Sequence, residues 1–242
     1  MASLADPALT GRTALVTGAS RGIGYAIARR LVDAGARVAM VARDAATLSA
    51  AASRAGGAAI PADVTDRSTV EALPARIEAA TGSRVPDYVV NSAGWFRLGA
   101  VAEMDATDFD RQIDANLRAP YLVIRTLLPL MLERGSGHIV TIGSIAGRVA
   151  MPGNGAYAAS KFGVRGLHAV LALELKGSGV RCTLVEPAAT DTPLWESIDR
   201  SVHGNLPPKE AMLQPDDVAD AVLYALTRPA RAGISNLALE RA

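Results

Sequence analysis

The sequence predicts an α/β fold: a single domain built on a doubly wound parallel sheet with helices on both faces. Short runs rich in β-branched residues alternate with helical stretches, the order that parallel strands and crossover helices require. A length of 242 residues suits one domain, so we expect residues 1–242 to form it. Half of the residues are apolar but only 4% are aromatic, so small aliphatic side chains must fill the core, as suits a parallel sheet.

The expected elements follow one another in strand–helix order. The strands are Thr13–Thr17, Arg37–Ala42, Ala58–Ala62, Asp87–Asn91, His138–Ser144, Val180–Glu186 and Ile234–Leu239. The helices are Gly22–Ala34, which Gly35 closes, Ala45–Ala55, a helix from an Asp66 cap towards Ala80, two long stretches between residues 91 and 138, Ala156–Lys176 and Asp216–Thr227. Ligands in such sheets bind beyond the carboxyl ends of the strands.

One long irregular stretch, at about 188–214, contains three prolines and one glycine. It is too long for a simple connection, and loops of this length are usually functional or mobile. We expect it to cover the ligand end of the sheet and to contact the substrate.

The charge distribution disfavours nucleic acid as a partner. The formal net charge is +1, from 25 basic and 24 acidic residues spread along the chain.

The cysteine and histidines do not suggest a metal site. Cys182 lies in an apolar run, where we expect a small buried hydrophobe. His138, His168 and His203 have no metal-ligand spacing, so we expect no metal.

Hydropathy also disfavours a membrane protein. The best apolar run, Pro120–Leu132, is interrupted by Arg125 and is too short to span a bilayer. The N-terminus has no basic segment followed by an apolar stretch, so we expect no secretion signal and a cytoplasmic location.

A glycine-rich turn follows the first strand and leads into a helix. Its residues are Thr17, Gly18, Ala19, Ser20, Arg21, Gly22, Ile23 and Gly24. Glycines allow the backbone to approach a pyrophosphate closely, and the helix N-terminus supplies amide donors with partial positive charge. Many glycine-rich turns are only turns, but the position between a strand and a helix favours a dinucleotide site.

This turn resembles the cofactor motif of the short-chain dehydrogenase/reductase family, and the resemblance extends from about residue 10 to residue 228. It implies a Rossmann fold and hydride transfer between a nicotinamide and a carbonyl/alcohol pair. NAD-preferring members have an acidic residue at the end of the second strand, where this chain has Ala42 followed by Arg43. We expect Arg43 and Arg21 to bind the 2′-phosphate of NADP(H), although both could instead be surface charges.

The resemblance implies further cofactor contacts. Asp63 and Val64 would contact adenine, although Asp63 could instead begin a helix. The run Asn91, Ser92, Ala93 and Gly94 is similar to the family's Asn-Asn-Ala-Gly motif, in which Asn91 steadies the central strand and Gly94 lets the cofactor pass.

The segment beside the nicotinamide would contain Pro187, Ala188, Thr190 and Thr192. Ala188 replaces the family's glycine, so it would be strained if that position required a positive φ. In that case cofactor affinity or loop geometry would shift, although the replacement removes no catalytic group.

The reacting groups are expected at Tyr157 and Lys161, which have the family's Tyr-x-x-x-Lys spacing. This spacing is about one helical turn, so both side chains share a face. A free tyrosine has a pKa near 10, and we expect Lys161 and the oxidised nicotinamide to lower it to about 7. Tyr157 would then donate a proton in reduction and accept one in oxidation. The resemblance implies that Lys161 also binds the nicotinamide ribose.

Two further residues complete the catalytic set. Ser144 ends a predicted strand thirteen positions before Tyr157, and its hydroxyl would polarise the substrate carbonyl, while Thr141 should face the other side of the strand. The resemblance gives Asn116 the role of kinking a helix and holding a water that links Lys161 to solvent. A mid-helix asparagine could also simply be exposed.

The expected substrate lining is mostly apolar and suits a bulky or aliphatic ketone. It comprises Trp95, Phe96, Arg97, Ile145, Met151, Pro152, Leu194, Trp195 and Ile198, beside Ser144.

Three functions remain open. The first is NADPH-dependent reduction of a ketone or aldehyde to an alcohol, or the reverse; the C-terminal segment resembles the branch with broad-specificity carbonyl reductases. The second is a 3-oxoacyl-carrier-protein-type ketoreductase, for which Arg97, Arg148 and Lys209 could form a basic entrance. The third, a non-catalytic NADP-binding regulator, should have lost catalytic residues that are present here.

The helix at 156–175 is apolar on nearly all sides, so more than one of its faces must be buried. This is consistent with the dimers and tetramers that are common in the family it resembles, so the resemblance implies a homodimer or homotetramer that acts on a small molecule.

Overall fold

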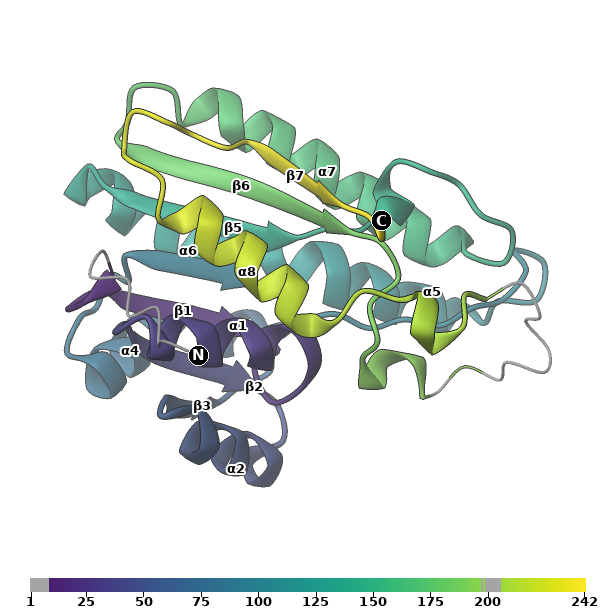
Figure 1. Ribbon diagram of the computed structural model, residues 1–242, viewed down its shortest axis with the longest axis horizontal. Helices are drawn as coiled ribbons and strands as arrows, with labels where there is room; N and C mark the ends of the chain where they lie inside the picture. The colour runs from purple at the N-terminus through teal and green to yellow at the C-terminus, as the bar shows by residue number, and fades with distance from the viewer. Residues whose placement is uncertain (1–8, 197, 199–205) are drawn as a thin grey trace.

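The computed structural model describes residues 9–196, 198 and 206–242, and within them a seven-stranded parallel sheet lies between two layers of helices (Figure 1). The strands are β1 Thr13–Thr17, β2 Arg37–Ala42, β3 Ala58–Pro61, β4 Tyr88–Asn91, β5 Gly137–Ile142, β6 Val180–Pro187 and β7 Asn236–Leu239. The helices are α1 Gly22–Asp33, α2 Ala45–Ala55, α3 Arg67–Glu71, α4 Leu73–Thr81, α5 Ala106–Ile113, α6 Ala119–Arg134, α7 Gly155–Glu174 and α8 Pro215–Leu226. The expected doubly wound sheet is confirmed.

One expected helix is divided. The stretch from Asp66 towards Ala80 forms α3 and α4, which meet at Ala72. Pro74 lies in the first turn of α4, where its missing amide hydrogen costs nothing but ends the hydrogen-bonded ladder of α3. The Asp66 cap is confirmed, because its carboxylate accepts from the Thr69 amide at 2.9 Å.

The core lies on both sides of the sheet. Along β1, Ala14 and Val16 point into one layer and Leu15 into the other, as strand alternation requires. The first layer is supplied by α1, α2 and α8, and the second by α3, α4, α6 and α7 (Figure 1). Within the described ranges, no helix is both long and apolar enough to cross a bilayer.

The sheet order is β3-β2-β1-β4-β5-β6-β7. From β1 the chain runs to one side through β2 and β3, then returns to place β4 against the other side of β1. The direction of winding therefore reverses between β1 and β4. A crevice at such a switch point is where ligands bind in open α/β sheets.

The expected loop at about 188–214 is only partly described, since residues 197 and 199–205 lie outside the described residues. Its two ends are tied together: the Asp191 amide donates to the Leu213 carbonyl at 2.8 Å, and the Leu213 amide donates to the Ala189 carbonyl at 2.9 Å. His203 and the first eight residues, on which the secretion-signal expectation depends, also lie outside the described residues.

Candidate active site

A cavity of about 1520 Å³ opens at the switch point between β1 and β4. Small-molecule pockets usually measure roughly 300–1,000 Å³, so this one has room for a large ligand beside a small one. Every cofactor, catalytic and substrate residue expected from the sequence lines it, except Asn91 among the cofactor residues and Arg97 and Ile198 among the substrate residues.

The glycine turn forms the anion-binding end of this cavity. Gly18 has a φ of +67°, and a Cβ there would lie 2.8 Å from backbone atoms of Ala93. Among the described residues, no side chain caps the N-terminus of α1, and its first turn has no acidic residue. The amides of that turn and their partial positive charge are therefore free to bind a pyrophosphate, and this site fits a dinucleotide.

Sequence reasoning gave no role to Thr17, the last residue of β1. Its Oγ1 accepts from the amides of Ser92 and Ala93 at 3.1 and 3.2 Å. Thr17 thus fastens the glycine turn to the segment that follows β4. The signal in the sequence that could have indicated this role is a hydroxyl residue directly before Gly18.

The far end of the cavity is basic. Arg21 and Arg43 both line it, as expected, and so does Asp44, which the sequence analysis did not consider. The Asp44 carboxylate accepts from the amide and the hydroxyl of Thr47 at 2.8 and 2.7 Å, and these bonds lower the pKa of Asp44. The Asp44 carboxylate therefore caps the N-terminus of α2.

Of the expected cofactor residues Asp63 and Asn91, only Asp63 lines the cavity. Oδ1 of Asp63 accepts from the amide and the hydroxyl of Thr65 at 2.9 and 2.7 Å, and Asp66 rather than Asp63 caps α3. Asn91 is buried in β4, opposite Thr141 of β5, and does not line the cavity. Within the described residues its side-chain amide has no hydrogen-bond partner.

Asn116 lies in a π-helical turn, Asp114–Arg118, between α5 and α6. It is buried, so the alternative of an exposed asparagine is wrong. Its Oδ1 accepts from the Trp95 amide at 2.9 Å, and its Nδ2 donates to the Trp95 carbonyl at 2.8 Å and to the Ser160 hydroxyl at 3.1 Å. Asn116 thereby joins the segment after β4 to α7, one residue before Lys161.

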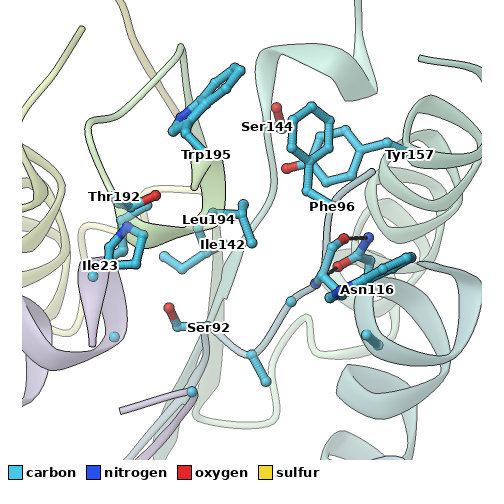
Figure 2. Close-up of a pocket in the computed structure, with 18 of the residues that line it drawn as sticks. Ile23, Ser92, Phe96, Asn116, Ile142, Ser144, Tyr157, Thr192, Leu194 and Trp195 are labelled. Carbon is cyan, nitrogen blue, oxygen red and sulfur yellow. Dashed lines mark hydrogen bonds between the residues drawn. The ribbon is translucent and has the colours of Figure 1, made fainter. Parts of the chain in front are cut away.

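Ser144 and Tyr157 point their hydroxyls into the same part of the cavity (Figure 2). Ser144 follows β5, and its Oγ accepts from the Ala146 amide at 3.1 Å, which fixes the side chain. The Lys161 ammonium donates to the Ile142 carbonyl at 3.0 Å and lies 5.5 Å from the centre of the Tyr157 ring.

The expected lowering of the Tyr157 pKa depends on the oxidised nicotinamide as well as on Lys161, so it stays a prediction, and in the chain by itself this pKa is not lowered. Burial raises the pKa of Tyr157 to about 12, and the hydrogen bond with Ser144 offsets only part of this. Burial also lowers the pKa of Lys161 to about 8. At neutral pH the phenol is therefore protonated and can act as a proton donor.

Two aromatic side chains form the substrate side of the cavity beside Tyr157. The Phe96 ring lies between Tyr157 and Trp195, at centroid distances of 4.7 and 5.3 Å (Figure 2). The Trp195 indole donates to the Thr190 carbonyl at 2.9 Å, which fixes the tryptophan. Arg111, which sequence reasoning missed, lines the same region with its guanidinium over the Trp95 ring.

The segment after β6 carries no backbone strain at Ala188. No described non-glycine residue has a positive φ, so the expectation of strain at this position is not met. Thr192 lies beside the glycine turn, because a Cβ on Gly22 would be 3.4 Å from its side chain. The Thr190 carbonyl accepts from the Trp195 indole, so it is not free to bind the nicotinamide carboxamide.

The fold and the cavity define a dinucleotide-binding oxidoreductase of the α/β class. The family model of the short chain dehydrogenases matches residues 12–202, so the chain belongs to this family.

Most of the chain is similar to known proteins and to a solved structure. An uncharacterized oxidoreductase of Staphylococcus aureus strain MW2 is 33% identical over 232 residues, covering 95% of this chain and 96% of that protein. A metagenomic short-chain oxidoreductase crystallised in complex with NADP is 35% identical, with a TM-score of 0.81 and coverage of 97% of this chain and 99% of that one. The glycine betaine reductase ATRR of Emericella nidulans is 37% identical over 96% of this chain, but the chain spans only 19% of that protein.

Proposed function

We propose that the chain is an NADP(H)-dependent oxidoreductase that reduces a ketone or aldehyde to an alcohol, or catalyses the reverse reaction. The observation that carries the proposal is the convergence of the Ser144 and Tyr157 hydroxyls, beside the buried Lys161, in a cavity that also contains an uncapped helix N-terminus. A reduced nicotinamide supplies a hydride when it is bound.

The chain's own residues would handle the proton. The Ser144 hydroxyl donates a hydrogen bond to the substrate oxygen and polarises the carbonyl. The Tyr157 phenol donates its proton to the same oxygen as negative charge develops there, and its raised pKa is consistent with a donor at neutral pH. Asn116 holds Trp95 and Ser160 in the N-terminal part of α7, which keeps the substrate wall and the tyrosine helix in fixed relation.

Two observations support NADP(H) over NAD(H). Arg21 and Arg43 line the adenosine end of the cavity, while Ala42 stands where an acidic residue would bind ribose hydroxyls. A guanidinium can bind a 2′-phosphate with two charge-assisted hydrogen bonds. The similar short-chain oxidoreductase was crystallised in complex with NADP.

The basic residues proposed for a carrier-protein entrance are already paired with acids. Arg97 contacts Asp108 at 2.8 Å, and Lys209 contacts Asp191 at 3.8 Å. Arg148 lies 3.6 Å from both Glu186 and Glu240. Paired charges attract an acidic partner weakly, so these contacts favour a free carbonyl compound as substrate.

We also propose a homo-oligomer. Phe162, Val170 and Leu173 expose 46%, 53% and 62% of their surface on α7, and helical spacing puts them on one face. Tyr121 and Leu132 of α6 are exposed as well. Light scattering after size-exclusion chromatography measures the mass directly; a monomer at micromolar concentration contradicts this proposal.

The deciding experiment compares the native protein with Tyr157→Phe. NADPH and NADH oxidation is measured against aliphatic, aryl and β-keto ester ketones and against an acyl thioester. We expect the native protein to turn over ketones with NADPH. In the variant, kcat should fall at least about 100-fold because the proton donor is gone. NADPH affinity should change less than about threefold, because the phenyl ring of the variant fills the same space as the tyrosine ring.

Tyr224→Phe, on the exposed face of α8, is the matched control and should leave turnover unchanged. Retained turnover in Tyr157→Phe contradicts the assigned role. NADPH binding without turnover of any ketone would favour a carrier-bound substrate or a regulator.

A further inference from the structure

A buried carboxylate, Glu186, lies directly behind the proposed reaction centre. It is the penultimate residue of β6, is 1% exposed and does not line the cavity. Both of its oxygens accept from one nitrogen of Arg165 at 2.6 Å, and Oε2 accepts from the Asn236 side chain at 2.7 Å. Arg148 approaches the same carboxylate at 3.6 Å.

The partners of Glu186 belong to the segments that carry the proposed reacting groups. Arg165 is in α7, one helical turn after Lys161 and two turns after Tyr157. Arg148 directly follows the 3₁₀ turn at residues 145–147, which begins just after Ser144. Glu186 itself precedes Pro187, at the wall of the cavity. One carboxylate therefore connects the serine turn, the tyrosine helix and the segment after β6.

Close packing reinforces these links. A Cβ on Gly143, the residue before Ser144, would lie 3.2 Å from Cγ of Glu186. A Cβ on Gly147 would lie 2.8 Å from the backbone oxygen of Lys161. The Glu186 stem and the serine turn thus leave little space between β5, β6 and α7, so movement of the carboxylate would be transmitted to both hydroxyls.

Stability alone does not account for such a group. Glu186 is buried while the Arg165 side chain is 42% exposed. An ion pair with a buried charge is often no less stable when apolar side chains of similar volume replace it, because the buried charge must be desolvated. Geometry does account for it, since misplacing a reacting group by about 1 Å can cost about 100-fold in rate. We infer that Glu186, through Arg165 and Arg148, is a positioning residue that holds Ser144 and Tyr157 in their reacting arrangement. This inference rests on the proposed function.

The test separates positioning from folding with three variants: Glu186→Gln, Arg165→Met and the two combined. Glu186→Gln keeps the shape of the side chain and an oxygen for Asn236, but it removes the charge. We expect kcat to fall at least about tenfold in each single variant, with the Kd for NADPH within about threefold of the native value. Measurements are made well below each variant's own Tm.

The double variant gives the decisive result. Arg165 is no longer left as a charge without Glu186, and Arg148 keeps Glu240, so we expect the Tm of the double variant to exceed that of Glu186→Gln, while kcat stays at least about tenfold below native. Recovery of kcat together with Tm would overturn the inference, since it would show a purely structural pair. Glu71→Gln, in the exposed pair with Arg67, is the control for carboxylate-to-amide exchange and should keep native kcat.

Tyr157→Phe is assayed alongside. If it retains turnover, the proposed function fails. If it is inactive while Glu186→Gln and Arg165→Met have native kcat, only the positioning inference fails.

Discussion

The ring of Phe96 meets the ring of Tyr157 edge-on, with centroids 4.7 Å apart and planes inclined by 66°. This arrangement covers one side of the proposed proton donor with an apolar wall, and Trp195 extends the wall across the cavity. A substrate carbonyl that reaches the Ser144 and Tyr157 hydroxyls would therefore have one of its substituents beside these rings.

Removing this wall should change substrate preference. We expect Phe96→Leu, which remains apolar and close in volume, to raise KM for aryl ketones about two- to tenfold, the size of an aromatic pair contribution. KM for small aliphatic ketones should change less. Steady-state assays with both substrate classes check this, and an equal change in both would show that Phe96 does not sort them.

The cofactor preference should depend on Arg43. In Ala42→Asp with Arg43→Ala, the ratio of kcat/KM for NADPH to that for NADH should fall at least about tenfold, because a charge-assisted contact is replaced by repulsion. Arg37→Ala, at a position outside the cavity, is the control for loss of an arginine. An unchanged ratio in the double variant would refute the 2′-phosphate site.

Two glycines with similar backbone angles allow a matched test of the anion site. Gly18 and Gly11 have φ of +67° and +77°, but only Gly18 would meet neighbouring backbone at 2.8 Å if it had a Cβ. Gly11→Ala should lower the free energy of unfolding by about 1 kcal/mol from the left-handed conformation alone. Gly18→Ala should cost more and should also weaken NADPH binding. Denaturant unfolding and a fluorescence titration measure both, and equal effects would contradict the close approach.

His168 should make the fold sensitive to acid. It is buried, both ring nitrogens lack a hydrogen-bond partner among the described residues, and burial lowers its pKa to about 4. Below a pH of about 6.5 the unfolded chain binds a proton that the folded chain does not, so stability falls as the pH drops towards 4.

Removing His168 should remove this loss. Relative to the native protein, His168→Leu should gain about 2 kcal/mol more at pH 5 than at pH 8 in the free energy of unfolding. Urea denaturation at the two pH values provides the measurement. A gain that is the same at both would mean that the imidazole is not the titrating group.

The sequence was sufficient for the features that depend on local pattern. Alternation of apolar runs predicts the strands, and the glycine turn and the spacing of Tyr157 from Lys161 predict which residues share the cavity. These signals work because strand and helix periodicity fix the direction of a side chain from its neighbours in the chain.

Features that depend on burial or on distant partners could not be predicted in this way. The raised pKa of Tyr157 follows from desolvation, which no local spacing reveals. The pairing of Arg97 with Asp108 and of Glu186 with Arg165 joins residues brought together only by the fold. The sequence also predicts that Asn91 contacts the cofactor. Its position in a strand paired on both sides turns it away from the cavity, and this too depends on the fold.

The pairing of β1 with β4 has a kinetic consequence. Val16 lies opposite Val90, so this step closes a long chain segment, and the cavity does not exist until it is complete. Non-local pairings of this kind slow folding because loop entropy is lost before contacts form. NADPH should therefore slow unfolding without accelerating refolding, as stopped-flow measurements with and without it would detect. Synthesis of the chain would then have to run well past residue 90 before any cofactor could bind.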